Sequence, residues 1–139
     1  MMIIQHQIIW DAGSELGVSL MDSDHRDLAD KINDVYDACT RHEWDGSIEH
    51  AMAELSYHTV NHFNREEAFM REIGYPGLRA HCKVHQKLTL ILDAISDRIG
   101  RDKAAAIDEE TVDFLKKWLL KHIQHADFRL AEYYRGIGL

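Results

Sequence analysis

The chain has 139 residues, of which 45% are hydrophobic and 29% charged, a size and composition typical of one soluble globular domain. Its formal net charge of −8 argues against binding to nucleic acid or to an anionic membrane surface, so we expect neither as a partner. Two cysteines are too few for a disulfide framework and no targeting segment is evident, so we expect a cytoplasmic location.

Turn-forming residues divide the chain into an N-terminal arm, residues 1–20, and four predicted helices. We expect these helices at about 22–41, 47–73, 78–99 and 109–135. Ser47 and Asp108 are the predicted N-cap residues of the second and fourth helices. Within each helix the inward-facing residues recur at alternating steps of three and four. We therefore predict a single domain over 1–139 with an all-α fold, an antiparallel up-down-up-down four-helix bundle.

Several inward positions carry ionisable side chains where apolar ones are expected. They are His25, His62, Glu66, His81, His85 and His122. A lone inward histidine is usually a core residue with satisfied hydrogen bonds, but this many would each require a partner. In an up-down-up-down bundle, the starts of the first and third helices share one end with the ends of the second and fourth. These residues should therefore converge on one layer, and a metal site explains them most simply.

The fourth predicted helix contains an irregularity after His122. Its apolar pattern resumes at Leu130, and one turn before Leu130 lies Asp127, five residues after His122. In a regular α-helix a side chain five residues on would point well away from the first. A π-bulge between residues 122 and 127 would absorb the mismatch, and such bulges cluster at functional sites. The sequence therefore predicts a widened turn there.

Five inward histidines and two carboxylates exceed the ligand number of one tetrahedral zinc ion. They suit two octahedral ions, and imidazole is a good ligand for iron, zinc, copper and nickel. If both carboxylates and one solvent oxygen bridged the ions, three bridges would fill six of twelve positions. Five histidines would fill five more, leaving one position for a small ligand.

The motifs "GVSLMDSDH" (17–25), "HFNREEAFM" (62–70), "HCKVH" (81–85) and "HIQHAD" (122–127) together resemble the single-domain bacterial hemerythrins, or bacteriohemerythrins. The resemblance covers nearly the whole chain and implies a four-helix bundle around a non-haem di-iron centre that binds dioxygen reversibly. It implies that His81, His85 and His122 hold one iron and that His25 and His62 hold the other. Glu66, Asp127 and an oxo or hydroxo group would bridge the ions. Dioxygen would bind at the open position of the iron held by His25 and His62.

The resemblance also nominates residues that line the oxygen pocket, namely Phe63, Trp118 and Leu119. The alternative interpretation is that they are ordinary core residues of the bundle. Both interpretations can hold, since apolar packing beside an open iron also limits the entry of water. A nearby charged group, Arg65, Glu67, Arg71 and Glu72, is interpreted as a solvated helix face. His58 is expected at the surface.

We therefore expect an oxygen-binding protein for storage, transport or sensing, and not an enzyme. The alternative is a di-iron enzyme or repair protein that handles peroxide or nitric oxide. The histidine-rich ligand set favours reversible binding, because ferritin-like oxidases use paired Glu-x-x-His motifs that this chain lacks. A protein that receives oxygen or a signal is a further expected partner, which the sequence does not identify.

Overall fold

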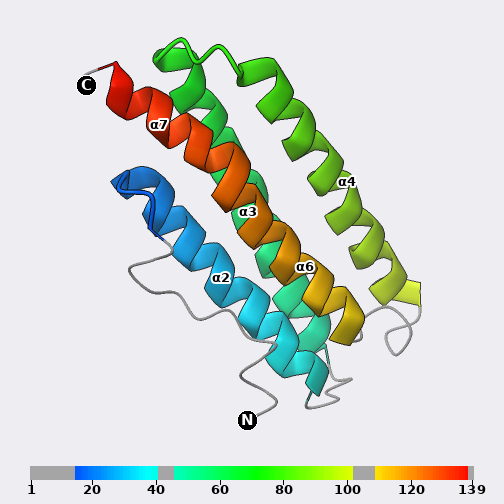
Figure 1. Cartoon of the computed structure of the whole chain (residues 1–139). Coiled ribbons are helices and arrows are strands. Elements are labelled where there is room, and N and C mark those ends of the chain that lie inside the picture. Colours follow the sequence, from blue (N-terminus) through cyan, green and yellow to red (C-terminus); the bar gives the residue numbers. More distant parts are fainter. Residues whose placement is uncertain (1–14, 41–45, 102–108, 138–139) are drawn as a thin grey trace.

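The computed structural model describes residues 15–40, 46–101 and 109–137. Its elements, in chain order, are α2 (Ser19–Thr40), α3 (Ser47–Glu72), α4 (Leu78–Arg101), α6 (Glu109–His122), η2 (Ile123–Asp127) and α7 (Phe128–Gly136). The last three run on as one continuous rod (Figure 1). Successive rods alternate in direction, and α2 packs against both α3 and α6. The predicted antiparallel four-helix bundle is confirmed.

The core consists of two apolar clusters. The larger cluster is centred on residues such as Ile32, Leu55, Leu92 and Leu115, and it lies toward the end of the bundle where α2 ends. The smaller cluster contains Val18, Met21, Met70, Leu130 and Ala131, at the opposite end. The inward ionisable residues fall between these clusters along each helix, so the bundle has apolar packing on both sides of a polar layer.

Helix α2 begins at Ser19, three residues earlier than the sequence predicted. The carboxylate of Asp22 accepts hydrogen bonds from the backbone N–H groups of Leu16 (2.7 Å) and Gly17 (2.9 Å), and the Asp22 N–H donates to the Val18 carbonyl. Asp22 therefore ties the incoming chain to the first turn, which lets the helix start before it. The rest of the arm, residues 1–14, lies outside the described residues.

The prediction of Ser47 as an N-cap is wrong, because Ser47 is the first residue of α3 and Gly46 is its N-cap. Gly46 has a φ of +103°, a left-handed conformation that glycine adopts readily, so the boundary falls there. At the other end, Gly74 has a φ of +66° and the Tyr75 N–H donates to the Met70 carbonyl, a Schellman-type ending. The predicted cap Asp108 lies outside the described residues.

The widened turn predicted after His122 is confirmed. Residues Ile123–Asp127 form the π-helix η2, and the Phe128 N–H donates to the Ile123 carbonyl five residues earlier. This wide turn brings His122 and Asp127 to the same side of the rod while Leu130 stays in the core. Among the described residues, no helix is long and apolar enough to cross a bilayer.

The π-turn makes a one-residue deletion within it easier to accommodate than one in the regular helix. Deleting the exposed Gln124 should convert η2 to regular helix, because His122, Asp127 and Leu130 would then follow a three-four spacing. We expect a loss of about 1 kcal/mol or less in the unfolding free energy of the metal-free protein.

Deleting Lys117, which lies in α6, is the matched control. It should rotate Leu119 and His122 out of register and destabilise the protein by several times more, on the order of 3 kcal/mol or above. The unfolding free energies of the two variants are compared by denaturant titration, with circular dichroism as the signal. Equal losses of unfolding free energy in the two variants would show that η2 does not contain the one extra residue relative to a regular helix.

Candidate metal centre

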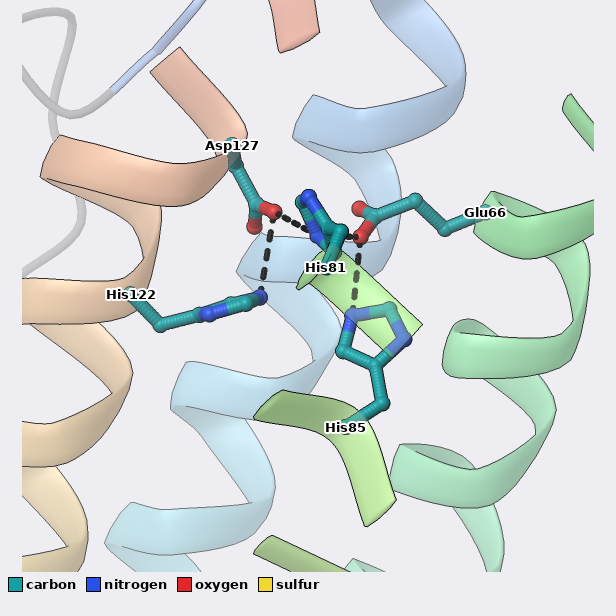
Figure 2. Close-up of side chains that lie close together, drawn as sticks. All are labelled: Glu66, His81, His85, His122 and Asp127. Carbon is teal, nitrogen blue, oxygen red and sulfur yellow. Dashed lines mark ion pairs between the residues drawn. The ribbon is translucent and has the colours of Figure 1, made fainter. Parts of the chain in front are cut away.

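Seven buried side chains from all four rods meet in the polar layer. Their ligand atoms form two overlapping groups in which all atoms lie within 4.8 Å of one another. One group consists of Glu66, His81, His85, His122 and Asp127, and the other of His25, His62, Glu66 and Asp127. Figure 2 shows the first group, with side chains from α3, α4, α6 and η2 pointing toward a common centre. Every ligand candidate named from the sequence is therefore brought together.

The two carboxylates each divide their oxygens between the two groups of histidines. Glu66 Oε1 lies 2.7 Å from His81 Nε2 and 3.0 Å from His85 Nε2, while its Oε2 lies 3.3 Å from His62 Nε2. Asp127 Oδ1 lies 3.0 Å from His81 Nε2 and 3.1 Å from His122 Nε2, while its Oδ2 lies 2.7 Å from His25 Nε2. Both side chains therefore span the two groups.

The donor atoms that face the centre fit a pair of cations. The Nε2 atoms of His62, His81, His85 and His122 and all four carboxylate oxygens are buried without a hydrogen bond of acceptable geometry. Leaving buried polar atoms without such partners is unfavourable. Metal ions bound between them would satisfy these atoms together, and imidazole with carboxylate is a donor set suited to iron.

The shifted pKa values of the cluster also indicate that it favours bound positive charge. Burial alone would raise the pKa of Glu66 and of Asp127, but contacts with the surrounding imidazoles hold both pKa values well below the usual range. Burial alone would lower the pKa of His62, yet the hydrogen bond to Asp24 and the nearby carboxylates of Glu66 and Asp127 raise it to about 10. Without metal, protons on imidazoles therefore balance the carboxylates, and bound cations would replace those protons.

Contacts outside the centre orient two of the imidazoles. His62 Nδ1–H donates to Asp24 Oδ2 (2.9 Å), and His85 Nδ1–H donates to Glu67 Oε2 (2.8 Å). Each bond leaves Nε2 directed to the centre, as outer carboxylates commonly do for metal-bound histidine. Arg65, Arg71 and Glu72 are exposed, as expected for a solvated helix face, although Arg65 also contacts Asp24. Glu67 departs from that expectation, because it is half-buried and contacts His85.

Sequence reasoning missed Asp24 and Glu67, and the available signal was weak. Each directly precedes or follows a ligand candidate, His25 or Glu66, but an acidic neighbour of this kind is usually solvated. His58, expected at the surface, is half-buried, and its Nδ1 lies 2.7 Å from Asp27 Oδ2.

Aromatic rings cover the three-histidine side of the centre. Phe63 stacks on the His85 ring, with centroids 3.8 Å apart, and the Trp118 ring lies nearly parallel to that of His122 at 5.9 Å. Phe63 also approaches His62 at 5.8 Å. Leu119 is 1% exposed and belongs to the larger apolar cluster. Of the three residues nominated for the oxygen pocket, Phe63 and Leu119 are buried and Trp118 is partly buried. Phe63 and Trp118 contact ligand rings of the three-histidine group.

The family described as "Hemerythrin HHE cation binding domain" matches residues 16–134. The chain belongs to the hemerythrin family. It is 29% identical over 121 residues to the bacteriohemerythrin of Pseudomonas aeruginosa (strain LESB58), a match that covers 86% of this chain and 76% of that protein. It is 31% identical over 121 residues to the myohemerythrin of Riftia pachyptila, with 87% and 88% covered.

Solved hemerythrin structures share the fold. A wild-type hemerythrin crystal structure superposes with a TM-score of 0.80 at 25% identity, covering 90% of this chain and 95% of that one. The crystal structure of a hemerythrin point mutant, in which a leucine is replaced by tyrosine, gives a TM-score of 0.81 at 24% identity over the same fractions. The hemerythrin bundle therefore accounts for nearly all of this chain.

If Glu66 and Asp127 each bridge two ions, replacing either with its amide should reduce the metal held. We expect Glu66→Gln and Asp127→Asn to retain well below two irons per chain, because a neutral amide oxygen is a weaker bridge than a carboxylate. Metal analysis after desalting measures the effect. The control is Glu72→Gln, an exposed position on α3. Two tightly held irons in both site variants would contradict the bridging assignment.

Proposed function

We propose that this hemerythrin binds dioxygen reversibly at a di-iron centre. One iron would be held by His81, His85 and His122, and the other by His25 and His62. Glu66, Asp127 and an oxo or hydroxo group would bridge them. The iron pair would supply the electrons that hold dioxygen, and the protein would supply ligands and exclude water.

The observation that carries the proposal is the division of each carboxylate between the two histidine groups. If the site held a single ion, the binding oxygens of both carboxylates would face the same group of histidines. Instead, Glu66 and Asp127 each direct one oxygen to each group. The match to a family described as a cation binding domain supports a metal at this site, and the resemblance of the sequence motifs to bacteriohemerythrins implies iron.

The two groups differ in the number of protein donors. The group that contains His81 has three imidazoles and two carboxylates, and the group that contains His25 has two imidazoles and the same two carboxylates. With similar ions on both sides, an iron held by His25 and His62 would have one protein ligand fewer than its neighbour. This difference supports placing dioxygen there.

The apolar surroundings suit reversible binding. Phe63 and Trp118 pack on the rings of His85 and His122, Leu119 is buried three residues before His122, and apolar clusters lie on both sides of the layer. Such surroundings limit the access of water, which would otherwise promote irreversible oxidation of the iron.

We further propose a cytoplasmic location, supported by Cys39 and Cys82, which are not joined in a disulfide and so suit a reducing compartment. The net charge of −8 supports the expectation that neither nucleic acid nor an anionic membrane is a partner. A protein that receives the oxygen or a signal remains part of the proposal.

Absorption spectra of the ferrous protein test the function. The protein is loaded with two ferrous ions without oxygen, exposed to air, and then freed of oxygen under argon. We expect a visible charge-transfer band that appears with oxygen and disappears on its removal over repeated cycles. Irreversible oxidation in the first cycle, or rapid turnover of peroxide or nitric oxide without an oxygenated form, would contradict the proposal.

Leu119 provides a test of the pocket. Replacing Leu119 by Ala should increase the rate of autoxidation several-fold, because the space left beside the polar layer admits water. The matched control is Leu115→Ala, one turn earlier on α6 and equally buried at 1% exposed. Both variants should lose about 2–5 kcal/mol of unfolding free energy. Equal autoxidation rates in the two variants would assign Leu119 to the core alone.

A further inference from the structure

A surface arginine connects to one of the ligand histidines through a single carboxylate. Asp24 on α2 accepts the His62 Nδ1–H bond through Oδ2 (2.9 Å). Arg65 on α3 donates to both oxygens of that carboxylate, from Nε to Oδ2 (3.0 Å) and from a terminal nitrogen to Oδ1 (2.8 Å). Asp24 is therefore held between an imidazole on the inside and a guanidinium on the outside.

The second outer carboxylate has a different arrangement. Glu67 accepts from His85, but the guanidinium of Arg71 approaches it only to 3.8 Å, beyond hydrogen-bond distance. The two-nitrogen contact of Arg65 is of the charge-assisted, bidentate kind that fixes both geometry and charge. The carboxylate bound by an arginine is therefore the one that contacts His62, and His62 belongs to the group with fewer protein donors.

A carboxylate that accepts a hydrogen bond from a metal-bound imidazole increases the electron donation of that imidazole to the metal. A guanidinium bound to the same carboxylate withdraws charge from it and opposes this effect. We propose that Arg65, acting through Asp24, limits the donor strength of His62 and thereby sets how readily the iron at His25 and His62 is oxidised. The proposal rests on the di-iron function proposed above.

Asp24 and Arg65 are positioning residues, because neither belongs to the groups of side chains that would hold the irons. The Arg65 side chain is 47% exposed and the Asp24 side chain is 16% exposed. Arg65 can therefore be changed without disturbing the core, while its effect reaches a buried ligand through two hydrogen-bonded contacts.

Opposite shifts are expected from the two ends of this chain of contacts. Arg65→Gln leaves Asp24 more negative, strengthens donation by His62, lowers the midpoint potential of the iron pair and speeds autoxidation several-fold. Asp24→Asn weakens donation, raises the midpoint potential and lowers iron affinity by about tenfold. Arg65→Lys keeps the charge but loses the two-nitrogen contact, so it should restore only part of the wild-type potential.

A double-mutant cycle distinguishes action through Asp24 from a simple charge effect across space. If Arg65 acts through Asp24, the potential shift caused by Arg65→Gln should disappear in the Asp24→Asn background. The charge control is Arg26→Gln, which removes the same charge beside His25 from a residue paired with Glu15. The same Arg65→Gln shift in both backgrounds, or an equal shift from Arg26→Gln, would overturn the proposal.

Nuclear magnetic resonance of the metal-free protein gives a readout that does not depend on iron. The Nδ1–H proton and nitrogen signals of the His62 ring should move in opposite directions in Arg65→Gln and Asp24→Asn and stay in place in Arg26→Gln. Unmoved His62 signals in both site variants would overturn the proposal. If the wild-type protein bound oxygen irreversibly, the proposed function would fail, yet the potentials and these signals would still decide whether Arg65 controls His62.

Discussion

Burying five imidazoles and two carboxylates in one layer is the constraint on which this structure depends. Their inward-facing atoms have few acceptable hydrogen-bond partners within the protein, and carboxylates that stay ionised require positive charge beside them. Protons on the imidazoles can supply that charge, but many of the inward-facing atoms still lack a hydrogen bond. Two cations could satisfy the donor atoms of both groups. Metal binding in this layer would therefore be coupled to folding, and conditions that remove the metal should weaken the native state.

The bundle meets the constraint with simple local features. Apolar clusters on either side keep the helices in register, so the layer forms at one height along all four rods. The wide turn η2 then places Asp127 beside His122, and hydrogen bonds from His62 to Asp24 and from His85 to Glu67 set the direction of two rings. The same outer contacts that position ligands can adjust their electronic properties, which connects the surface of the protein to the reactivity of the centre.

The sequence predicted the helices, their directions and the convergence of seven ionisable side chains, because each depends on the spacing of residues along the chain. Even η2 was visible, since the five-residue spacing from His122 to Asp127 does not fit a regular helix. Contacts between helices were harder to predict. The pairing of Asp24 with His62 joins residues 38 apart on α2 and α3, and an acidic side chain next to a ligand gives no periodic signal. The start of α2 and the Gly46 cap depend on backbone geometry that sequence patterns indicate only loosely.

We propose above all that two irons share the bridges formed by Glu66 and Asp127. Mössbauer spectroscopy of the protein loaded with iron-57 and fully oxidised tests it most directly, because bridged ferric ions couple their spins. We expect a single spin-coupled pair, without magnetic hyperfine splitting at low temperature and weak field. This pair should include nearly all of the iron, at two per chain. Magnetically isolated ferric ions, or one iron per chain, would contradict it.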